Sequence, residues 1–336
     1  MTDRAAQTAP SPFTIFEALD AYQISLVLKG AIELDAFTHI ADGATSVPEI
    51  ARRIGASERG IRILCDFLAV RGFLTKADGH YGLTPESAAF LNKRSPAYLG
   101  STAFFLAHDF HMNHFRDIAA VVRKGGSIDT GNMAPDDPIW VEFARDMAPI
   151  ALAARPLIPF MAEAGRPMKV LDIAAGPGMY GIMVAQHNPA AEIVAVDWGN
   201  VLEVARENAV KFGVAARYRT IPGSAFEVDF GGGYDLVLLT QFLHHFDPPT
   251  NVKLLRKIRA AMNPGGLLAT LEMIPNEDRI SPPFAAAFSM MMLASTPAGD
   301  AYTFRELDQM FREAGFGASL LQSSPESPIP AILTRN

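Results

Sequence analysis

The sequence predicts an α/β protein in which a doubly wound, mostly parallel sheet follows a smaller helical domain. From Met168 onward, apolar segments of strand length alternate with helical segments, as in parallel sheets joined by crossover helices. The first predicted strand runs into the turn Gly176-Pro177-Gly178, which is typical of backbone that approaches a ligand closely. The length of 336 residues exceeds what one hydrophobic core usually serves, so two domains are expected.

The composition argues against several classes of protein. With 49% hydrophobic and 19% charged residues, the chain is neither disordered nor collagen-like. The 29 Lys and Arg against 36 Asp and Glu give a formal charge of −7, so no nucleic-acid partner is expected. The single cysteine, Cys65, rules out an intrachain disulfide and a cysteine metal site. No apolar run suits a membrane span or a signal peptide, which predicts a cytoplasmic protein without membrane contact.

The amino-terminal part predicts a winged helix over residues 13–96, behind a disordered leader over residues 1–12. Apolar residues at helical spacing run through residues 13–28 and 31–37. Ser46 and Ser57 are placed to cap two further helices, which end near Gly55 and Val70. Residues 71–75 and 80–84 indicate a hairpin. The apolar residues between 13 and 37 exceed what so small a domain can bury, which predicts a homodimer.

A helical connector is predicted over residues 97–165, with breaks at Gly125-Gly126 and at Pro135. The larger domain is predicted over residues 166–336. Its expected strands are residues 169–174, 192–197, 217–221, 234–240 and 267–274. A Ser- and Pro-rich loop over residues 322–330 precedes a final apolar segment, residues 331–333.

The strongest local signal is the glycine turn. Gly176, Gly178 and Gly181 have the spacing G-x-G-x-x-G, and Asp197 ends the second strand, where a carboxylate that holds ribose hydroxyls belongs. This pattern alone fits a nicotinamide dinucleotide as well as S-adenosylmethionine, because both ligands carry an adenosine ribose.

Three segments resemble class I S-adenosylmethionine-dependent methyltransferases: Asp172 before the glycine turn, Tyr234-Asp235-Leu236-Val237, and Asn263-Pro264-Gly265-Gly266. More narrowly, residues 13–334 resemble the small-molecule O-methyltransferases of the plant caffeate type and the bacterial polyketide type. This resemblance implies a Rossmann-like catalytic domain behind a winged-helix dimerisation domain. It also implies S-adenosylmethionine as cofactor and a small aromatic or polyketide-like acceptor.

The resemblance also implies a reaction centre. Residues 239–247 are similar to the family segment that holds the catalytic histidine, and His244 matches that position. A phenol is mostly protonated at neutral pH, and histidine, with an ordinary pKa of about 6.5, suits the role of its base. The resemblance implies that Glu272 orients this histidine, with a capped strand end as the alternative. The family's second acid falls near Ala301, beside Asp300, and His245 is expected to be structural.

Further pocket residues follow from the same matching. Gly176 is expected at the methionine end of the cofactor, Asp197 at the ribose and Trp198 over the adenine, and Ser224 stands where the family has an adenine-contacting aspartate. A predicted helix before Tyr302 offers a deformable apolar lining that suits a flat aromatic substrate, with core packing as the alternative. The remaining cofactor candidates are Asp172, Phe226, Gln241 and Met147, and the acceptor candidates are Phe143, Phe288, Met291 and Met292.

Three other functions stay open at this point. His108, Asp109, His111 and His114 invite a zinc site, but a solvated or pocket-edge helix face is the better interpretation, so no metal is expected. A winged helix also suits a DNA-binding regulator, although the positive surplus across residues 46–76 is only three charges. Within the same fold, methylation at carbon or nitrogen, or use of S-adenosylmethionine only as a scaffold, remains possible, and the acceptor is not identified.

Overall fold

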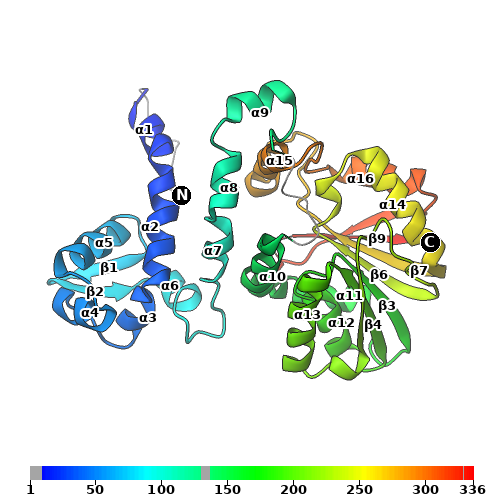
Figure 1. Ribbon diagram of the computed structural model, residues 1–336, viewed down its shortest axis with the longest axis horizontal. Helices are drawn as coiled ribbons and strands as arrows, with labels where there is room; N and C mark the ends of the chain where they lie inside the picture. Colours follow the sequence, from blue (N-terminus) through cyan, green and yellow to red (C-terminus); the bar gives the residue numbers. More distant parts are fainter. Residues whose placement is uncertain (1–9, 130–136, 328) are drawn as a thin grey trace. The chain divides into compact units, whose positions relative to one another are not determined.

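The computed structural model describes residues 10–129, 137–327 and 329–336. Its contacts divide the chain into two units, Met1–His108 and Asp109–Asn336, and each is described by itself (Figure 1). The division falls inside the segment predicted as a connector. Most of the predicted leader, and the predicted break at Pro135, lie outside the described residues.

The first unit is helical apart from one hairpin, in which β1 and β2 pair antiparallel. Ser46 and Glu49 form a capping box at the start of α4, and Gly55 ends that helix in the left-handed conformation, as the sequence predicts. Its elements are α1 (Phe13–Leu19), α2 (Ala21–Glu33), α3 (Ala36–Ala41), α4 (Val47–Ile54), α5 (Glu58–Val70), β1 (Leu74–Ala77), β2 (His80–Leu83), α6 (Pro85–Phe90) and α7 (Thr102–Leu106).

The apolar residues predicted at helical spacing over residues 13–28 and 31–37 are divided among three helices, α1, α2 and α3. α2 continues through Lys29 and Gly30. The ammonium group of Lys29 donates to the carbonyl oxygen of Ala107 (3.1 Å), so the middle of α2 is fixed by a contact distant in sequence. The chain turns instead at Asp35, whose φ of 55° is left-handed.

The second unit is the predicted α/β domain, preceded by short helices. Its helices are α8 (Asp109–His114), α9 (Ile118–Lys124), α10 (Pro138–Ala151), α11 (Ile158–Met161), α12 (Met179–His187), α13 (Gly199–Lys211), α14 (Pro248–Ala261), α15 (Pro283–Ser295) and α16 (Phe304–Glu313), with 3₁₀ turns at Leu152–Leu157, Ala215–Arg217 and Leu243–His245. Its strands are β3 (Met168–Ile173), β4 (Ala191–Asp197), β5 (Tyr218–Pro222), β6 (Tyr234–Thr240), β7 (Met262–Leu271), β8 (Ser319–Gln322) and β9 (Ala331–Arg335).

The seven strands form one sheet in the order β5-β4-β3-β6-β7-β9-β8. Strands β3 to β7 are parallel, and β9 lies antiparallel to both β7 and β8. The sequence did not predict β8, whose Leu320 and Leu321 are exposed at the edge of the sheet. β7 ends at Leu271, not at residue 274, so Glu272 lies just beyond its strand.

Helices cover both faces of the sheet. One face packs against α11, α12 and α13, and the other packs against α14 and α16 (Figure 1). Along β3, Val170 points to the first of these cores and Leu171 to the second, and both are fully buried. A strand buried on both faces is a near-continuous apolar run, which is why the sequence pattern identified it.

The order in which strands are added to the sheet reverses at β3. β4 lies on one side of β3, and β6 lies on its other side. In an open α/β sheet, this switch point forms a crevice outside the carboxyl ends of the strands, where ligands bind. Asp197 ends β4, and Gln241 and Glu272 directly follow β6 and β7. The crevice therefore gathers the residues predicted to act. Among the described helices, none has the length and apolar composition needed to cross a membrane.

Candidate active site

His244 and Glu272 form a buried pair beside the switch point. The Nδ1 atom of His244 lies 2.5 Å from Oε2 of Glu272, and the two residues are only 5% and 3% exposed. The other oxygen of Glu272 accepts the backbone N–H groups of Phe242 (2.8 Å) and Leu243 (2.7 Å). Glu272 thus acts as an acceptor throughout, so Nδ1 carries the proton and donates it. Nε2 is then the nitrogen of His244 that can take up a proton.

The loop that carries His244 is held at its carbonyl groups as well. The amide of Asn251 donates to the carbonyl oxygens of Leu243 (2.9 Å) and Phe246 (3.2 Å), and the hydroxyl of Tyr302 donates to Phe246 (2.6 Å). Sequence reasoning missed Asn251 and Tyr302. The available signal was an asparagine on the apolar, buried face of α14, where an amide needs hydrogen-bond partners.

The glycine turn and Asp197 are joined directly. Each carboxylate oxygen of Asp197 accepts one backbone N–H, from Gly176 and from Trp198, both at 2.7 Å. Gly178 has a φ of 74°, and a Cβ atom there would lie 2.4 Å from the hydroxyl of Tyr218, so only glycine fits. Burial raises the pKa of Asp197 to about 6, while the two N–H bonds oppose that rise.

Asp172 lies beneath the same turn and is fully buried. One of its oxygens accepts the N–H of Gly181 (3.0 Å) at the start of α12, and the other has no partner among the described residues. Burial raises its pKa to about 8, an effect that the Gly181 bond reduces and the charge of Asp197 reinforces. Asp172 therefore holds the helix start that follows the glycine turn, and its second carboxylate oxygen accepts no hydrogen bond from the described residues.

These groups fit S-adenosylmethionine. The oxygens of Asp197 retain lone pairs that can accept ribose hydroxyls, and the turn at Gly176 presents backbone without a Cβ atom. Trp198 and Phe226, whose aromatic side chains would suit a purine, follow β4 and β5 in the chain. Trp198 packs on the small core of Ala144, Val201 and Val204, and the Phe226 ring lies 5.0 Å from that of Phe246.

The other predicted cofactor residues lie around this crevice. The Ser224 hydroxyl accepts the N–H of Phe226 (3.2 Å), so it caps its own turn. Gln241 has a left-handed φ of 52°, and both its backbone and side-chain amides donate to the Leu271 carbonyl (2.7 and 3.3 Å). The Phe143 ring would lie 3.6 Å from a Cβ atom on Gly176. Met147 follows one helical turn later on α10 and is half-buried.

His245 lies in an aromatic surrounding. Its ring is 6.2 Å from Trp140 and 6.3 and 6.1 Å from Phe242 and Phe246, and it lies 4.3 Å from the ring of His244. Burial, with a smaller effect of the His244 charge, lowers the pKa of His245 well below its ordinary value. His245 is therefore neutral, and its structural role stays a prediction.

On the acceptor side, α15 brings one predicted residue to His244. The ring of Phe288 meets His244 edge-on, with centroids 5.0 Å apart. Met292 is buried and Met291 is half-buried on the same helix. Phe284 and Met290 are exposed. The pocket roles of Phe143, Phe288, Met291 and Met292 remain predictions.

Asp300, which stands beside the place of the family's second acid, is bound by groups other than His244 in the described residues. Its carboxylate accepts from the guanidinium of Arg279 (3.4 Å) and from the backbone of Ala301 (2.8 Å), in a partly exposed position. Because Ala301 is fully buried and carries no acid, Glu272 is the acidic partner that His244 has in the described part of the chain. As for a metal, residues 10–129, 137–327 and 329–336 contain no cluster of three or more side chains able to hold one.

Comparisons with known proteins identify the family of this chain. A family model of the O-methyltransferase domain matches residues 155–317, and a model of the O-methyltransferase dimerisation domain matches residues 16–93. A protein of Nostoc punctiforme, described as a putative O-methyltransferase, has a known crystal structure and is 49% identical to this chain. That structure has a TM-score of 0.93, and the match covers 98% of this chain and 100% of the other.

Two curated relatives are more distant. The 3-hydroxy-5-methyl-1-naphthoate 3-O-methyltransferase of Streptomyces sahachiroi is 28% identical, over 86% of this chain and 84% of its own length. The bacteriochlorophyllide d C-20 methyltransferase of Chlorobaculum tepidum is 25% identical, over 76% and 78%. Because both domain models match and the identity is 49% over 98% of the chain, this chain belongs to the S-adenosylmethionine-dependent O-methyltransferase family, with its dimerisation and catalytic domains.

Proposed function

We propose that the protein methylates a hydroxyl group of a small aromatic or polyketide-like molecule, with His244 as the general base. The observation that carries this proposal is the buried pair of His244 and Glu272 at the crevice. A histidine whose Nδ1 is held by a carboxylate presents Nε2 as a base in a fixed orientation. The naphthoate relative, which by its name methylates a ring hydroxyl, supports the choice of acceptor.

S-adenosylmethionine, when bound, supplies an electrophilic methyl group on a sulfonium sulfur. Nε2 of His244 would take up the hydroxyl proton of the acceptor, so that the acceptor oxygen is nucleophilic toward that methyl group. Glu272 stabilises the imidazolium that results, because its carboxylate lies 2.5 Å from Nδ1. Phe288 covers the edge of the imidazole and helps to exclude water from it.

Methylation at carbon is the second candidate, since one relative is by its name a C-20 methyltransferase. A screen of phenols, flavonoids and aromatic polyketides with radiolabelled methyl donor tests the proposal directly. Mass spectrometry of the product then distinguishes an O-methyl ether from a C-methyl product. Binding of the donor without any labelled product across the screen would count against methyl transfer to such acceptors.

Replacement of Asp197 by alanine is expected to weaken S-adenosylmethionine binding by about 10- to 100-fold, since a hydrogen bond to a charged group contributes about 1.5 to 3 kcal/mol. Because its pKa is raised to about 6, the wild-type affinity should also fall as the pH drops below about 6, where the carboxyl becomes protonated. Titration calorimetry at pH 5 and pH 7.5 measures both effects. If neither the Asp197→Ala substitution nor the change of pH altered the affinity, the proposal that Asp197 binds the cofactor would be wrong.

We further propose a homodimer formed through the amino-terminal helices. Apolar side chains on α1 and α2 are exposed in the single chain, and a cluster of this kind marks a partner surface. They are Phe13, Ile15, Phe16, Leu19 and Tyr22. The dimerisation-domain match over residues 16–93 supports a second copy as the partner.

Light scattering is expected to give about twice the chain mass of 36.3 kDa. A Phe16→Asp, Leu19→Asp double variant should shift the protein toward the monomer, because it places charge on that surface. Val210→Asp, at an exposed apolar residue on α13, is the matched control. A wild-type monomer at micromolar concentration, or a dimer that ignores the α1 changes, would contradict this surface assignment.

A further inference from the structure

The turn that carries His244 depends on contacts with other parts of the chain. His244 lies in the 3₁₀ turn Leu243–His245, whose backbone bonds, from His245 to Phe242 and from Phe246 to Leu243, are both 3.2 Å long. Hydrogen bonds in such short turns have poor geometry, so the turn does not fix a side chain by itself. The direction of the imidazole must therefore come from groups outside the turn.

Two buried side chains donate to the carbonyl groups of this segment, whereas Glu272 accepts its N–H groups. The Nδ2 atom of Asn251 lies 2.9 Å from the oxygen of Leu243 and 3.2 Å from that of Phe246. The hydroxyl of Tyr302 lies 2.6 Å from the same Phe246 oxygen. Asn251 is fully buried and Tyr302 is 6% exposed, so these bonds lie away from solvent. Both side chains take no part in the steps proposed for the reaction.

The hydroxyl of Tyr302 remains a donor over the pH range in which a histidine base works. Burial, reinforced by the charge of Asp300, raises the pKa of Tyr302 above its ordinary value. A carbonyl oxygen only accepts, so the neutral phenol satisfies it by donating its proton. The bond to Phe246 is therefore present at neutral and at mildly alkaline pH.

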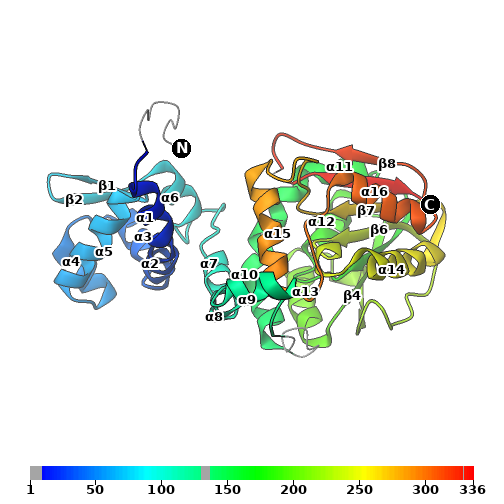
Figure 2. The same cartoon turned by 90° about the horizontal axis from the view of Figure 1, so that it is seen from above.

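Asn251 and Tyr302 belong to two neighbouring helical segments. Asn251 lies on α14, and Tyr302 directly precedes Thr303, whose hydroxyl caps α16. The two helices lie side by side (Figures 1 and 2). They share one hydrophobic core beneath the sheet face that they cover. The two donors are therefore held in one packed frame.

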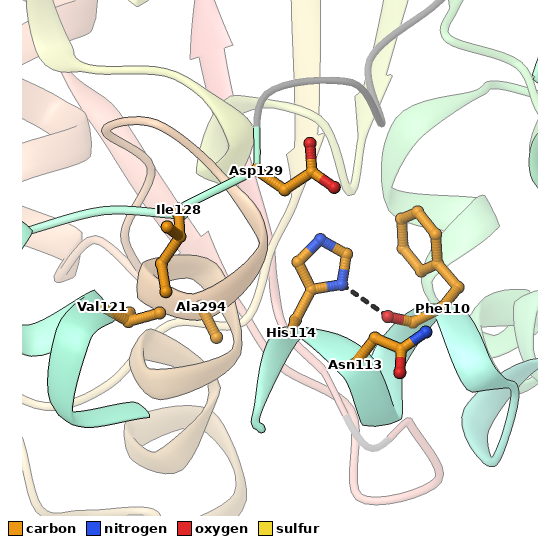
Figure 3. A pocket seen from close by; sticks show the side chains of 7 residues that line it. All are labelled: Phe110, Asn113, His114, Val121, Ile128, Asp129 and Ala294. Atoms are coloured by element: carbon orange, nitrogen blue, oxygen red, sulfur yellow. Dashed lines mark hydrogen bonds between the residues drawn. The ribbon is translucent and has the colours of Figure 1, made fainter. Parts of the chain in front are cut away.

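The chain before this tyrosine also approaches His244. A Cβ atom on Gly299 would lie 2.1 Å from the carbonyl oxygen of His244, so only glycine fits there. The N–H of Gly299 donates to the hydroxyl of Thr296 (2.8 Å), just after α15. Ala294, on the last turn of α15, lines one cavity with Val121 of α9 (Figure 3), so the end of α15 is itself packed. The backbone of the histidine thus has a fixed neighbour.

We propose that Tyr302 and Asn251 are positioning residues of the methyl transfer, whose bonds keep Nε2 of His244 directed at the acceptor hydroxyl. The inference rests on the proposed function, in which this imidazole is the base. When a donor is lost, the turn opens more often and the Nδ1–H bond to Glu272 opens with it. Nε2 then points at the acceptor for less of the time, which slows the reaction. The groups assigned to the cofactor are untouched, so its affinity stays the same.

Tyr302→Phe removes one hydroxyl, and Tyr234→Phe is the matched control. The hydroxyl of Tyr234 also donates to a backbone carbonyl, that of Phe230, at 2.6 Å, and Tyr234 is 1% exposed. It begins β6, whereas the turn that carries His244 follows the other end of this strand. Each variant loses one buried hydrogen bond of the same kind, so their thermal midpoints should fall by similar amounts. A purely structural role would therefore affect both variants alike.

The proton on Nδ1 of His244 gives a measurement that needs no acceptor. It is observed by low-field proton NMR on the full chain saturated with S-adenosylhomocysteine, and it is identified by its absence from His244→Ala. Its exchange with water should be about 3- to 10-fold faster in Tyr302→Phe than in wild type, the effect of one hydrogen bond on a local opening, and unchanged in Tyr234→Phe. Asn251→Leu keeps the size of the side chain but removes both of its bonds, so it should accelerate exchange at least as much.

With the acceptor found in the screen, kcat should fall about 3- to 10-fold in Tyr302→Phe at unchanged affinity for S-adenosylmethionine, and keep its wild-type value in Tyr234→Phe. Equal exchange in wild type and Tyr302→Phe would overturn the inference, as would equally fast exchange in both phenylalanine variants or an unchanged kcat despite faster exchange. If the wild-type protein methylates no acceptor in the screen, the proposed function fails, and the exchange rates still decide whether the two donors hold the imidazole.

Discussion

Replacement of His244 by alanine is expected to lower turnover by about 10²- to 10⁴-fold, which is the usual contribution of a positioned general base. The affinity for S-adenosylmethionine should stay nearly unchanged, because Asp197 and the glycine turn hold the cofactor independently of the imidazole. A residue that acts only in the transition state lowers kcat and kcat/KM together. Steady-state kinetics on the acceptor found in the screen, with calorimetry for the cofactor, measure both quantities.

The control for this variant is His245→Ala, which removes the neighbouring imidazole. His245 is neutral and has no hydrogen bond to Nδ1 in the described residues, so turnover should change far less. Because His244 is buried, its loss leaves Oε2 of Glu272 without a partner, and circular dichroism and a thermal melt must show that the variant is folded. Full activity of folded His244→Ala would leave catalysis to proximity and desolvation, and the assignment of the base would be wrong.

The sheet and the position of the crevice could be predicted because both depend on local patterns. Buried parallel strands are continuous apolar runs in the sequence. A turn such as Gly176-Pro177-Gly178 usually marks a place where the backbone is approached closely. Asp197 ends its strand at the predicted residue. The proximity of His244 and Glu272, 28 residues apart, follows from the register of the sheet, in which Thr240 of β6 pairs with Leu271 of β7. The residues after paired positions lie at the same edge.

Other features depend on contacts that leave no pattern in the sequence. The continuation of α2 through Gly30 is accompanied by the bond from Lys29 to Ala107, 78 residues away. Asp300 stands beside the place of the family's second acid, but its carboxylate is bound by Arg279, which comes from a different loop. Matching by position cannot detect that competition for a charged partner. Similarly, His108, His111 and His114 look alike in the sequence, whereas the structure gives His114 a bond to the carbonyl oxygen of Phe110.

Replacement of Glu272 by glutamine is expected to lower turnover almost as much as loss of His244, although the two side chains have nearly the same shape. The amide oxygen can still accept the N–H groups of Phe242 and Leu243, which places the amide NH₂ group opposite His244. That group donates, so Nδ1 must become the acceptor and the proton must move to Nε2. An Nε2 atom that already carries a proton cannot accept one from the substrate, and an enforced wrong tautomer is severely damaging in comparable carboxylate and histidine pairs.

The double variant tests whether the two residues act as one unit. Glu272→Gln with His244→Ala should be no slower than His244→Ala alone, because the carboxylate acts on the substrate only through the imidazole. Glu272→Ala, by contrast, also leaves two buried N–H groups without an acceptor, so its thermal midpoint should fall while that of Glu272→Gln stays close to wild type. Multiplicative losses in the double variant would show that Glu272 contributes independently of His244. If Glu272→Gln kept wild-type turnover, the tautomer argument would fail, and Glu272 would serve only to hold the loop that carries the histidine.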